Sequence, residues 1–285
     1  MIASLLGDTV PADQPQAEMW MGAHPKSPSK VIVNGERFSL ADLIAAHPDA
    51  VLGVDTARRF NGQMPFLFKV LAAAKPLSIQ AHPNRAQALK GFDRENRSGI
   101  ALDAPHRNYR DASHKPEIIC ALTPFWGLNG FQPIAAIQKN LGHYGPETLT
   151  TLAAMLKAPE AASGLRTFLE ALLRMPGRRR AEVIAEVTDK AALKDADPAA
   201  TWVLRLHAAY PEDIGILAPL FLNLVRLAPG QAMYLSAGQL HAYLEGLGIE
   251  LMANSDNVLR GGLTPKHVDI DELSRVLAFS AGEAQ

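Results

Sequence analysis

The chain changes twice in the periodicity of its apolar residues. From Pro146 to about Pro219, apolar residues recur every three or four positions in segments rich in Ala, Leu, Glu, Lys and Arg, which predicts four or five short helices. Short β-type runs separated by turn residues lie on both sides of this region. We therefore expect a discontinuous β domain (1–140 and 220–285) that carries an inserted helical subdomain (141–219), with no internal repeat.

The β-type regions predict particular elements. Asn34-Gly35 supplies the positive φ angles of a tight hairpin turn between 31–33 and 36–38. Ser39, with Asp42 three residues later, predicts the start of a helix that ends before Pro48. Further strands are expected at 66–71, 77–83, 117–122, 222–227, 231–235, 239–246 and 248–253, and a helix at 269–279.

Composition excludes several classes of partner. The formal net charge is -1, so the excess of Lys and Arg typical of nucleic-acid binding is absent. The one cysteine, Cys120, cannot form an internal disulfide. No basic leader opens the sequence, and no apolar run approaches the roughly 20 residues needed to span a bilayer. We expect a cytoplasmic protein that binds neither nucleic acid nor membranes.

The run LSIQAHP (77–83) alternates apolar and polar residues before a proline. Successive side chains of a strand point to opposite faces, so Ser78, Gln80 and His82 share one face. Taken alone, this pattern favours a polar edge that faces solvent. The same rule pairs Lys115 with Glu117 in the next strand.

A second interpretation brings these polar faces inward. His241 shares a face with Tyr243. In a β-sandwich or barrel, the side chains of Gln80, His82, Glu117 and His241 could form a four-ligand shell, for which two imidazoles favour zinc. One carboxylate cancels only one of the two metal charges, so such an ion would remain a Lewis acid. Spacing alone leaves both interpretations open.

Four cationic residues accompany these candidate ligands: Lys69, Lys115, Arg260 and Lys266. Lysines in apolar strands are commonly edge protectors or have side chains that extend to solvent. If the four converge beside a metal, they form an anion site of the kind that holds a phosphate.

Four runs closely resemble the type I mannose-6-phosphate isomerases of the cupin superfamily: FLFKVLAAAKPLSIQAHPN, RNYRDASHKPEIICALTPFWGLNGF, PGQAMYLSAGQLHAYLEG and IELMANSDNVLRGGLTPKHVD. AEMWMGAHPKSPS also resembles a segment of that family. The resemblance extends from about Ala17 to Phe279. It also fits the cupin pattern G-x5-P-x-G-x2-H, from Gly230 to His241, except that Ser236 replaces the proline.

The resemblance implies a mainly β fold with an α insertion, a cupin-type jelly-roll sandwich or barrel. It implies one zinc ion per chain, held by Gln80, His82, Glu117 and His241. It places the active-site arginine at Arg260 and other polar pocket positions at Lys69, Ser78, Lys115, Glu250, Asp256 and Lys266. The implied reaction interconverts mannose 6-phosphate and fructose 6-phosphate.

Such a reaction moves a proton between C1 and C2 through a cis-enediol, which needs an acid or base near both carbons. We expect Arg260 to stabilise the developing charge and Ser78, Lys69 and Lys266 to bind the sugar phosphate. Lys115, Glu250 and Asp256 remain alternative bases.

Family members usually start earlier and continue into a second sandwich. We therefore expect that second sandwich to be incomplete here, with 265–285 leading into it, and the protein to be a monomer or homodimer. Two alternatives stay open. One is an iron-dependent cupin dioxygenase or epimerase, and the other is a non-catalytic sugar-phosphate or metal-binding cupin or an inactive truncated homologue.

Overall fold

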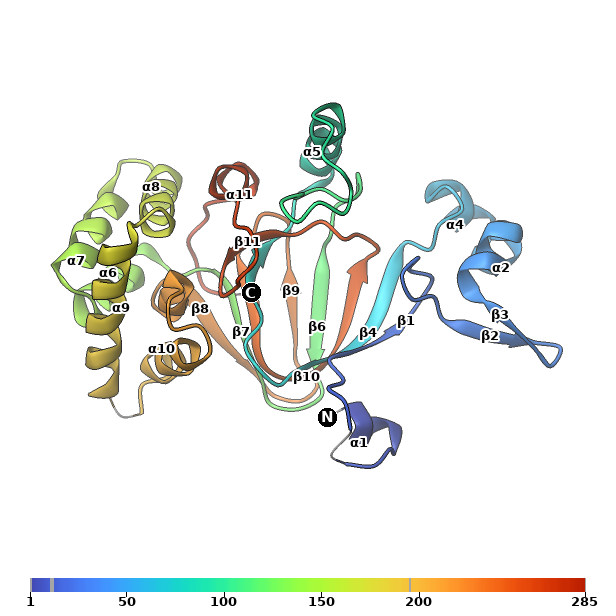
Figure 1. The fold of residues 1–285 in the computed structure, drawn as a ribbon, viewed down its shortest axis with the longest axis horizontal. Coiled ribbons are helices and arrows are strands. Elements are labelled where there is room, and N and C mark those ends of the chain that lie inside the picture. Colours follow the sequence, from blue (N-terminus) through green and yellow to red (C-terminus); the bar gives the residue numbers. More distant parts are fainter. Residues whose placement is uncertain (1, 11–12, 195, 285) are drawn as a thin grey trace.

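The computed structural model describes residues 2–10, 13–194 and 196–284. Nine strands form the main sheet structure (Figure 1). They are β1 (Glu18–Met21), β4 (Phe66–Ala73), β5 (Ile79–Ala81), β6 (Glu117–Ala121), β7 (Phe125–Phe131), β8 (Leu222–Leu227), β9 (Ala232–Leu235), β10 (His241–Ala253) and β11 (Leu259–Gly262). A separate hairpin consists of β2 (Lys30–Val33) and β3 (Glu36–Ser39).

Strand β10 joins two layers of this structure. Its first half pairs with β5 and β7, and its second half pairs with β4 and β6, all antiparallel. Gly246, at φ 133°, lies between the halves, and a Cβ there would come within 2.6 Å of the Phe125 ring. The strands predicted at 239–246 and 248–253 are therefore one bent strand, because glycine allows the backbone to turn without ending it.

The space between the two layers has an apolar end and a polar end. The apolar end is filled by buried side chains of Leu71, Ile119, Phe125, Met233, Leu235 and Tyr243, among others. The polar end lies toward His82, Glu117 and His241, which are also buried. The layers thus enclose an interior whose polar part is the candidate site.

The helices predicted over 146–219 are present on the side of β7 and β8 (Figure 1). They are α7 (Glu147–Ala154), α8 (Ala161–Leu173), α9 (Gly177–Ala192) and α10 (Pro198–Ala209), preceded by α6 (Ile134–Tyr144). Their apolar faces share one core with the sheet, in which Phe168 and Trp202 belong to the same cluster as Leu128 and Leu244. The insertion is therefore packed firmly against the layer that carries His241.

The prediction of a mainly β chain is not confirmed, because helices hold 40% of the residues and strands 22%. The additional helices come from segments that look like loops in the sequence. They are α1 (Ile2–Leu6), α3 (Pro48–Leu52), α4 (Val54–Arg59) and α5 (Arg85–Arg97), whereas α2 (Leu40–Ala46) and α11 (Ile270–Val276) are helices that the sequence predicted. None of the helices described is long and apolar enough to cross a membrane.

Two local predictions are confirmed. Asn34 and Gly35 both have positive φ, as the tight turn between β2 and β3 requires. Ser39 caps α2 by accepting a hydrogen bond from the backbone N–H of Asp42. These elements lie at one end of the molecule, away from the helical insertion (Figure 1).

The long segment between α5 and β6 is fixed by a buried network around Tyr109. Its backbone N–H donates to Glu95 Oε2 at 2.9 Å, and its hydroxyl donates to Glu272 Oε1 at 2.6 Å. Arg107 contacts Glu95 as well, at 3.4 Å. This network anchors the start of the segment that leads to Lys115, which lies beside Glu117 at the polar end of the interior.

Candidate active site

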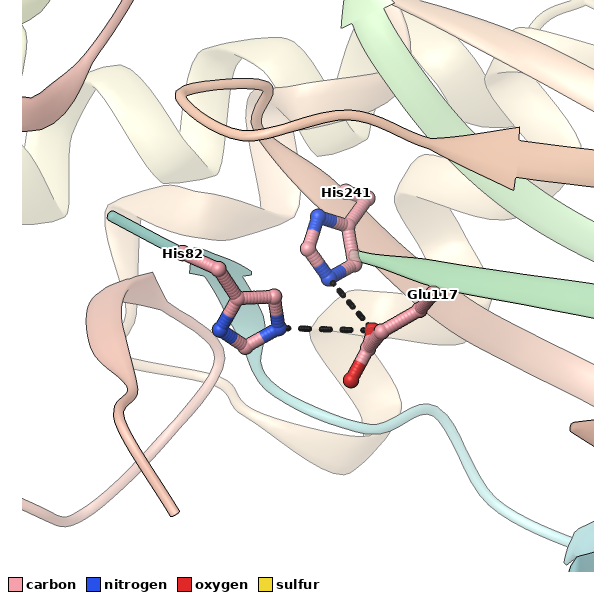
Figure 2. A group of neighbouring side chains, drawn as sticks. All are labelled: His82, Glu117 and His241. Atoms are coloured by element: carbon pink, nitrogen blue, oxygen red, sulfur yellow. Dashed lines mark ion pairs between the residues drawn. The ribbon is translucent and has the colours of Figure 1, made fainter. Parts of the chain in front are cut away.

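Three buried side chains point at one another between the layers (Figure 2). Glu117 Oε2 lies 3.3 Å from His82 Nε2 and 3.4 Å from His241 Nε2. Glu117 belongs to β6 and His241 to β10, while His82 directly follows β5. The ligand atoms of all three lie within 4.8 Å of one another, which is close enough to share one metal ion.

Backbone carbonyls orient both imidazole rings. The Nδ1 atom of His82 lies 2.8 Å from the carbonyl oxygen of Asn257, and that of His241 lies 2.9 Å from the carbonyl oxygen of Gln239. A carbonyl can only accept, so each Nδ1 carries the proton and each Nε2 presents a lone pair to Glu117. Histidines that bind metals typically donate their other ring N–H to such a carbonyl, which fixes the tautomer and the orientation of the ring.

The three facing atoms, His82 Nε2, His241 Nε2 and Glu117 Oε2, have no hydrogen-bond partner although all are buried. Such orphaned polar atoms are costly unless something satisfies them. Burial lowers the pKa of His82 to about 4, so its lone pair stays free at neutral pH. Burial opposes ionisation of Glu117, yet the nearby charge of Lys115 holds its pKa well below the usual range. Two imidazoles and one carboxylate fit a divalent cation.

Gln80 lies next to this group by strand register. Its Cα is the direct partner of His241 on β10 and of Arg260 on β11. Directly opposite residues of antiparallel strands present their side chains on one face. His241, Gln80 and Arg260 therefore form a row across three strands, with the Gln80 side chain on the same face as that of His241.

A cavity of about 250 Å³ opens beside Glu117. Its lining contains most of the predicted site: Glu18, Lys69, Leu71, Leu77, Ser78, Gln80, Lys115, Glu117, Tyr243 and Glu250. Ser78 and Gln80 of the 77–83 run thus border a polar cavity, although the strand itself spans only Ile79–Ala81.

A chain of polar contacts forms one wall of this cavity. Lys69 Nζ lies 2.6 Å from Glu250 Oε2 and 3.4 Å from Glu18 Oε1. Tyr243 donates a 2.8 Å hydrogen bond to the other oxygen of Glu250. Burial and the charge of Glu117 raise the pKa of Glu250. Burial opposes the charge on Lys69, but its carboxylate neighbours outweigh this and raise its pKa, so it stays protonated.

Lys115 occupies the opposite side of Glu117 from the histidines. Its Nζ lies 3.0 Å from Glu117 Oε1, and the residue is only 8% exposed. One oxygen of the Glu117 carboxylate therefore contacts the Lys115 ammonium group, and the other faces the two imidazole rings.

The structure places the remaining candidates outside the cavity lining. Asp256 lines a neighbouring cavity of about 410 Å³, where its carboxylate lies 2.6 Å from Lys26 Nζ. Arg260 is half-buried on the edge strand β11, next to Gln80. Lys266 is exposed in the turn after β11.

Sequence reasoning did not select three residues that the geometry brings in. Tyr243 was visible as the face-mate of His241, and Glu18 lies in the AEMWM run that carries part of the resemblance. Asn257 contributes its backbone carbonyl to His82, for which a side-chain pattern gives no signal.

The fold and the site define a metal-binding protein of two joined β layers with a polar cavity beside its metal ligands. Residues 1–134 match the family model described as phosphomannose isomerase type I, catalytic domain. The chain is 44% identical to the mannose-6-phosphate isomerase of Salmonella typhimurium, over 99% of this chain and 72% of that protein. It is 38% identical to the human mannose-6-phosphate isomerase, over 100% of this chain and 70% of that protein.

Solved structures agree. A crystal structure of zinc-bound mannose 6-phosphate isomerase superposes with a TM-score of 0.92 at 43% identity, covering 100% of this chain and 71% of that one. A point mutant of the phosphomannose isomerase from Salmonella typhimurium gives a TM-score of 0.93 at 43% identity, covering 99% and 71% of the two chains. This chain belongs to the mannose-6-phosphate isomerases of type I, which confirms the family expected from its motifs.

Proposed function

We propose that this protein is a zinc-dependent isomerase that interconverts mannose 6-phosphate and fructose 6-phosphate. The observation that carries the proposal is the convergence of three unpartnered buried ligand atoms, from His82, Glu117 and His241, beside a cavity lined by ionisable groups. Zinc is supported by the two imidazoles and by the zinc-bound relative. Gln80 would provide the fourth protein ligand, and one ion would bind per chain.

When bound, zinc would supply a Lewis acid that polarises the sugar oxygens at C1 and C2. The chain's own groups must then move a proton between these carbons through a cis-enediol. Glu250 is the best placed of the three candidate bases, because its carboxylate lines the cavity. Its pKa is also raised toward neutral pH, where a general base works best. Lys69 and Tyr243 hold one oxygen each and fix its position.

Glu250 also has two partners, but the other two candidates either pair with a metal ligand or lie in the neighbouring cavity. Lys115 is engaged with the metal ligand Glu117, where its charge favours the ionised ligand. Asp256 is engaged with Lys26 in the neighbouring cavity. We therefore assign Lys115 to holding Glu117 and assign the proton transfer to Glu250. Ser78 borders the cavity, where its hydroxyl can bind a sugar oxygen.

Several finer features remain part of this proposal. They are the cupin-type jelly roll and the division into a β domain (1–140 and 220–285) and a helical subdomain (141–219). The cytoplasmic location and the oligomeric state, monomer or homodimer, also belong to the proposal. The joined layers around β10 and the helical insertion support the first two.

The mechanism can be tested by running the reaction in D2O. Proton transfer through an enediol should place deuterium from solvent at C1 of fructose 6-phosphate and at C2 of mannose 6-phosphate. Complete retention of hydrogen at both carbons, even after many turnovers, would favour a hydride shift over an enediol whose base exchanges its proton with solvent.

A further inference from the structure

The ammonium groups that line the cavity already have carboxylate partners. Lys69 lies between Glu250 and Glu18, and Lys115 pairs with Glu117. These five side chains sum to a net charge of about -1, with every lysine compensated. A phosphate dianion binds best to cations whose charge is not already matched, so the cavity wall is a poor place for it.

Arg260 is a cation of a different kind. Its direct register with Gln80 puts its side chain on the same face as the ligand row, but on the edge strand β11. Among the described residues, no carboxylate lies within 4.0 Å of its guanidinium. Two strand spacings, or about 10 Å, separate β10 from β11. Arg260 therefore lies at the edge of the site, which we call the rim, whereas His241 lies among the candidate metal ligands.

The segment after Tyr109 carries a second arginine, Arg110, which lines the neighbouring cavity that also contains Asp256. The backbone N–H of Arg110 donates a 2.7 Å hydrogen bond to Asn257 Oδ1, three residues before Arg260. The backbone carbonyl of Asn257 also orients His82, so the residue that holds the Arg110 backbone contacts a candidate metal ligand as well. Arg110 is exposed, and its guanidinium too has no carboxylate within 4.0 Å in the described part of the chain.

The two arginines influence each other. Burial and then the charge of Arg110 hold the pKa of Arg260 below its usual range. Two like charges without carboxylate partners repel, and an anion placed between them removes the repulsion. Guanidinium groups also match phosphate oxygens geometrically, through paired N–H donors.

We propose that Arg110 and Arg260 together bind the phosphate group of the substrate. The proposal rests on the proposed function, because it places C1 and C2 near the metal ligands and the phosphate on C6 at the rim. It makes Arg110 a substrate-binding residue, and it assigns Lys69 to an uncharged sugar oxygen.

The test compares Arg110→Met with Arg37→Met. Arg37 is a matched control, because it is an exposed arginine on β3 that, among the described residues, has no carboxylate partner. Arg110→Met should raise KM for mannose 6-phosphate about 10-fold or more while kcat changes less than about 3-fold. Arg37→Met should change neither, and Arg110→Lys should restore part of the loss.

Inorganic phosphate provides a readout that does not depend on turnover. It should raise the melting temperature of the zinc-loaded wild-type protein, and Arg110→Met should abolish most of that rise. An unchanged KM together with an unchanged phosphate-induced shift in Arg110→Met would overturn the proposal. A wild-type protein without isomerase activity would instead refute the proposed function, while the phosphate shift would still test the anion site.

Discussion

Tyr243 donates a 2.8 Å hydrogen bond to Glu250, although both residues belong to strand β10 and are seven positions apart. In a straight strand they would be about 23 Å apart and on opposite faces. The bend at Gly246 folds the two halves toward each other, so both side chains reach the same cavity. This relationship places a buried carboxyl opposite the metal ligands.

Glu250→Gln should lower kcat by about 100-fold to 10,000-fold, the range typical of a lost general base. The amide keeps the shape and the contact with Tyr243 but cannot accept a proton. Zinc content should stay near that of the wild-type protein. Steady-state kinetics and elemental analysis check both expectations.

Asp256→Asn should lower kcat by less than about 10-fold, because the Asp256 carboxylate pairs with Lys26 outside the cavity lining. A larger loss in Asp256→Asn than in Glu250→Gln would reverse the assignment of the base. Unchanged rates in Glu250→Gln, Asp256→Asn and Lys115→Ala together would exclude all three candidates.

The metal-free protein should lose stability as the pH falls from 6.5 toward 4. His82 has a folded pKa of about 4 against an ordinary value of 6.5, because burial disfavours its charged form. The unfolded chain takes up a proton first, so the stabilisation is complete above pH 6.5 and is lost as the pH approaches 4. The full effect is about 3 kcal/mol.

Urea unfolding of the metal-free protein at several pH values measures this slope. His82→Asn, which has no imidazole at that position, should show a flatter dependence between pH 6.5 and 4. Equal slopes in the two proteins would contradict the buried neutral histidine.

Gly91→Ala should destabilise the protein although it lies within helix α5. Alanine normally favours a helix over glycine by about 1 kcal/mol. Here the new Cβ would come within 2.3 Å of the Tyr109 ring, which Glu95 and Glu272 hold in place. Such overpacking costs about 1–3 kcal/mol.

Gly142→Ala is the matched control for this substitution. Gly142 lies in α6, and a Cβ there meets nothing within 4 Å. The free energy of unfolding of the Gly142→Ala variant should be unchanged or higher by up to about 1 kcal/mol. If thermal unfolding shows that both variants gain stability, the close contact between α5 and Tyr109 is wrong.

Local rules predicted much of the metal site. The alternation of LSIQAHP put Gln80 and His82 on one face, the same rule offered Glu117 and His241 as partners, and the resemblance of the four motif runs selected the same four residues. The structure brings His82, Glu117 and His241 within 4.8 Å of one another. Period two succeeds here because each ligand lies in or directly beside a regular strand segment.

The same rule fails where the chain bends. It gave no sign that Glu250 meets Tyr243, because Gly246 changes the direction of the strand between them. Nor could spacing predict the Tyr109 network, which joins α5, the following segment and α11 through contacts between residues distant in sequence. Those contacts depend on tertiary packing, which local periodicity does not encode.

The most direct measurement combines zinc content with turnover of mannose 6-phosphate, for the wild-type protein and for Glu117→Gln. We expect about one zinc per wild-type chain, activity that a chelator removes and zinc restores, and loss of both metal and activity in Glu117→Gln. Full activity in a wild-type protein free of metal, or in Glu117→Gln, would contradict this expectation.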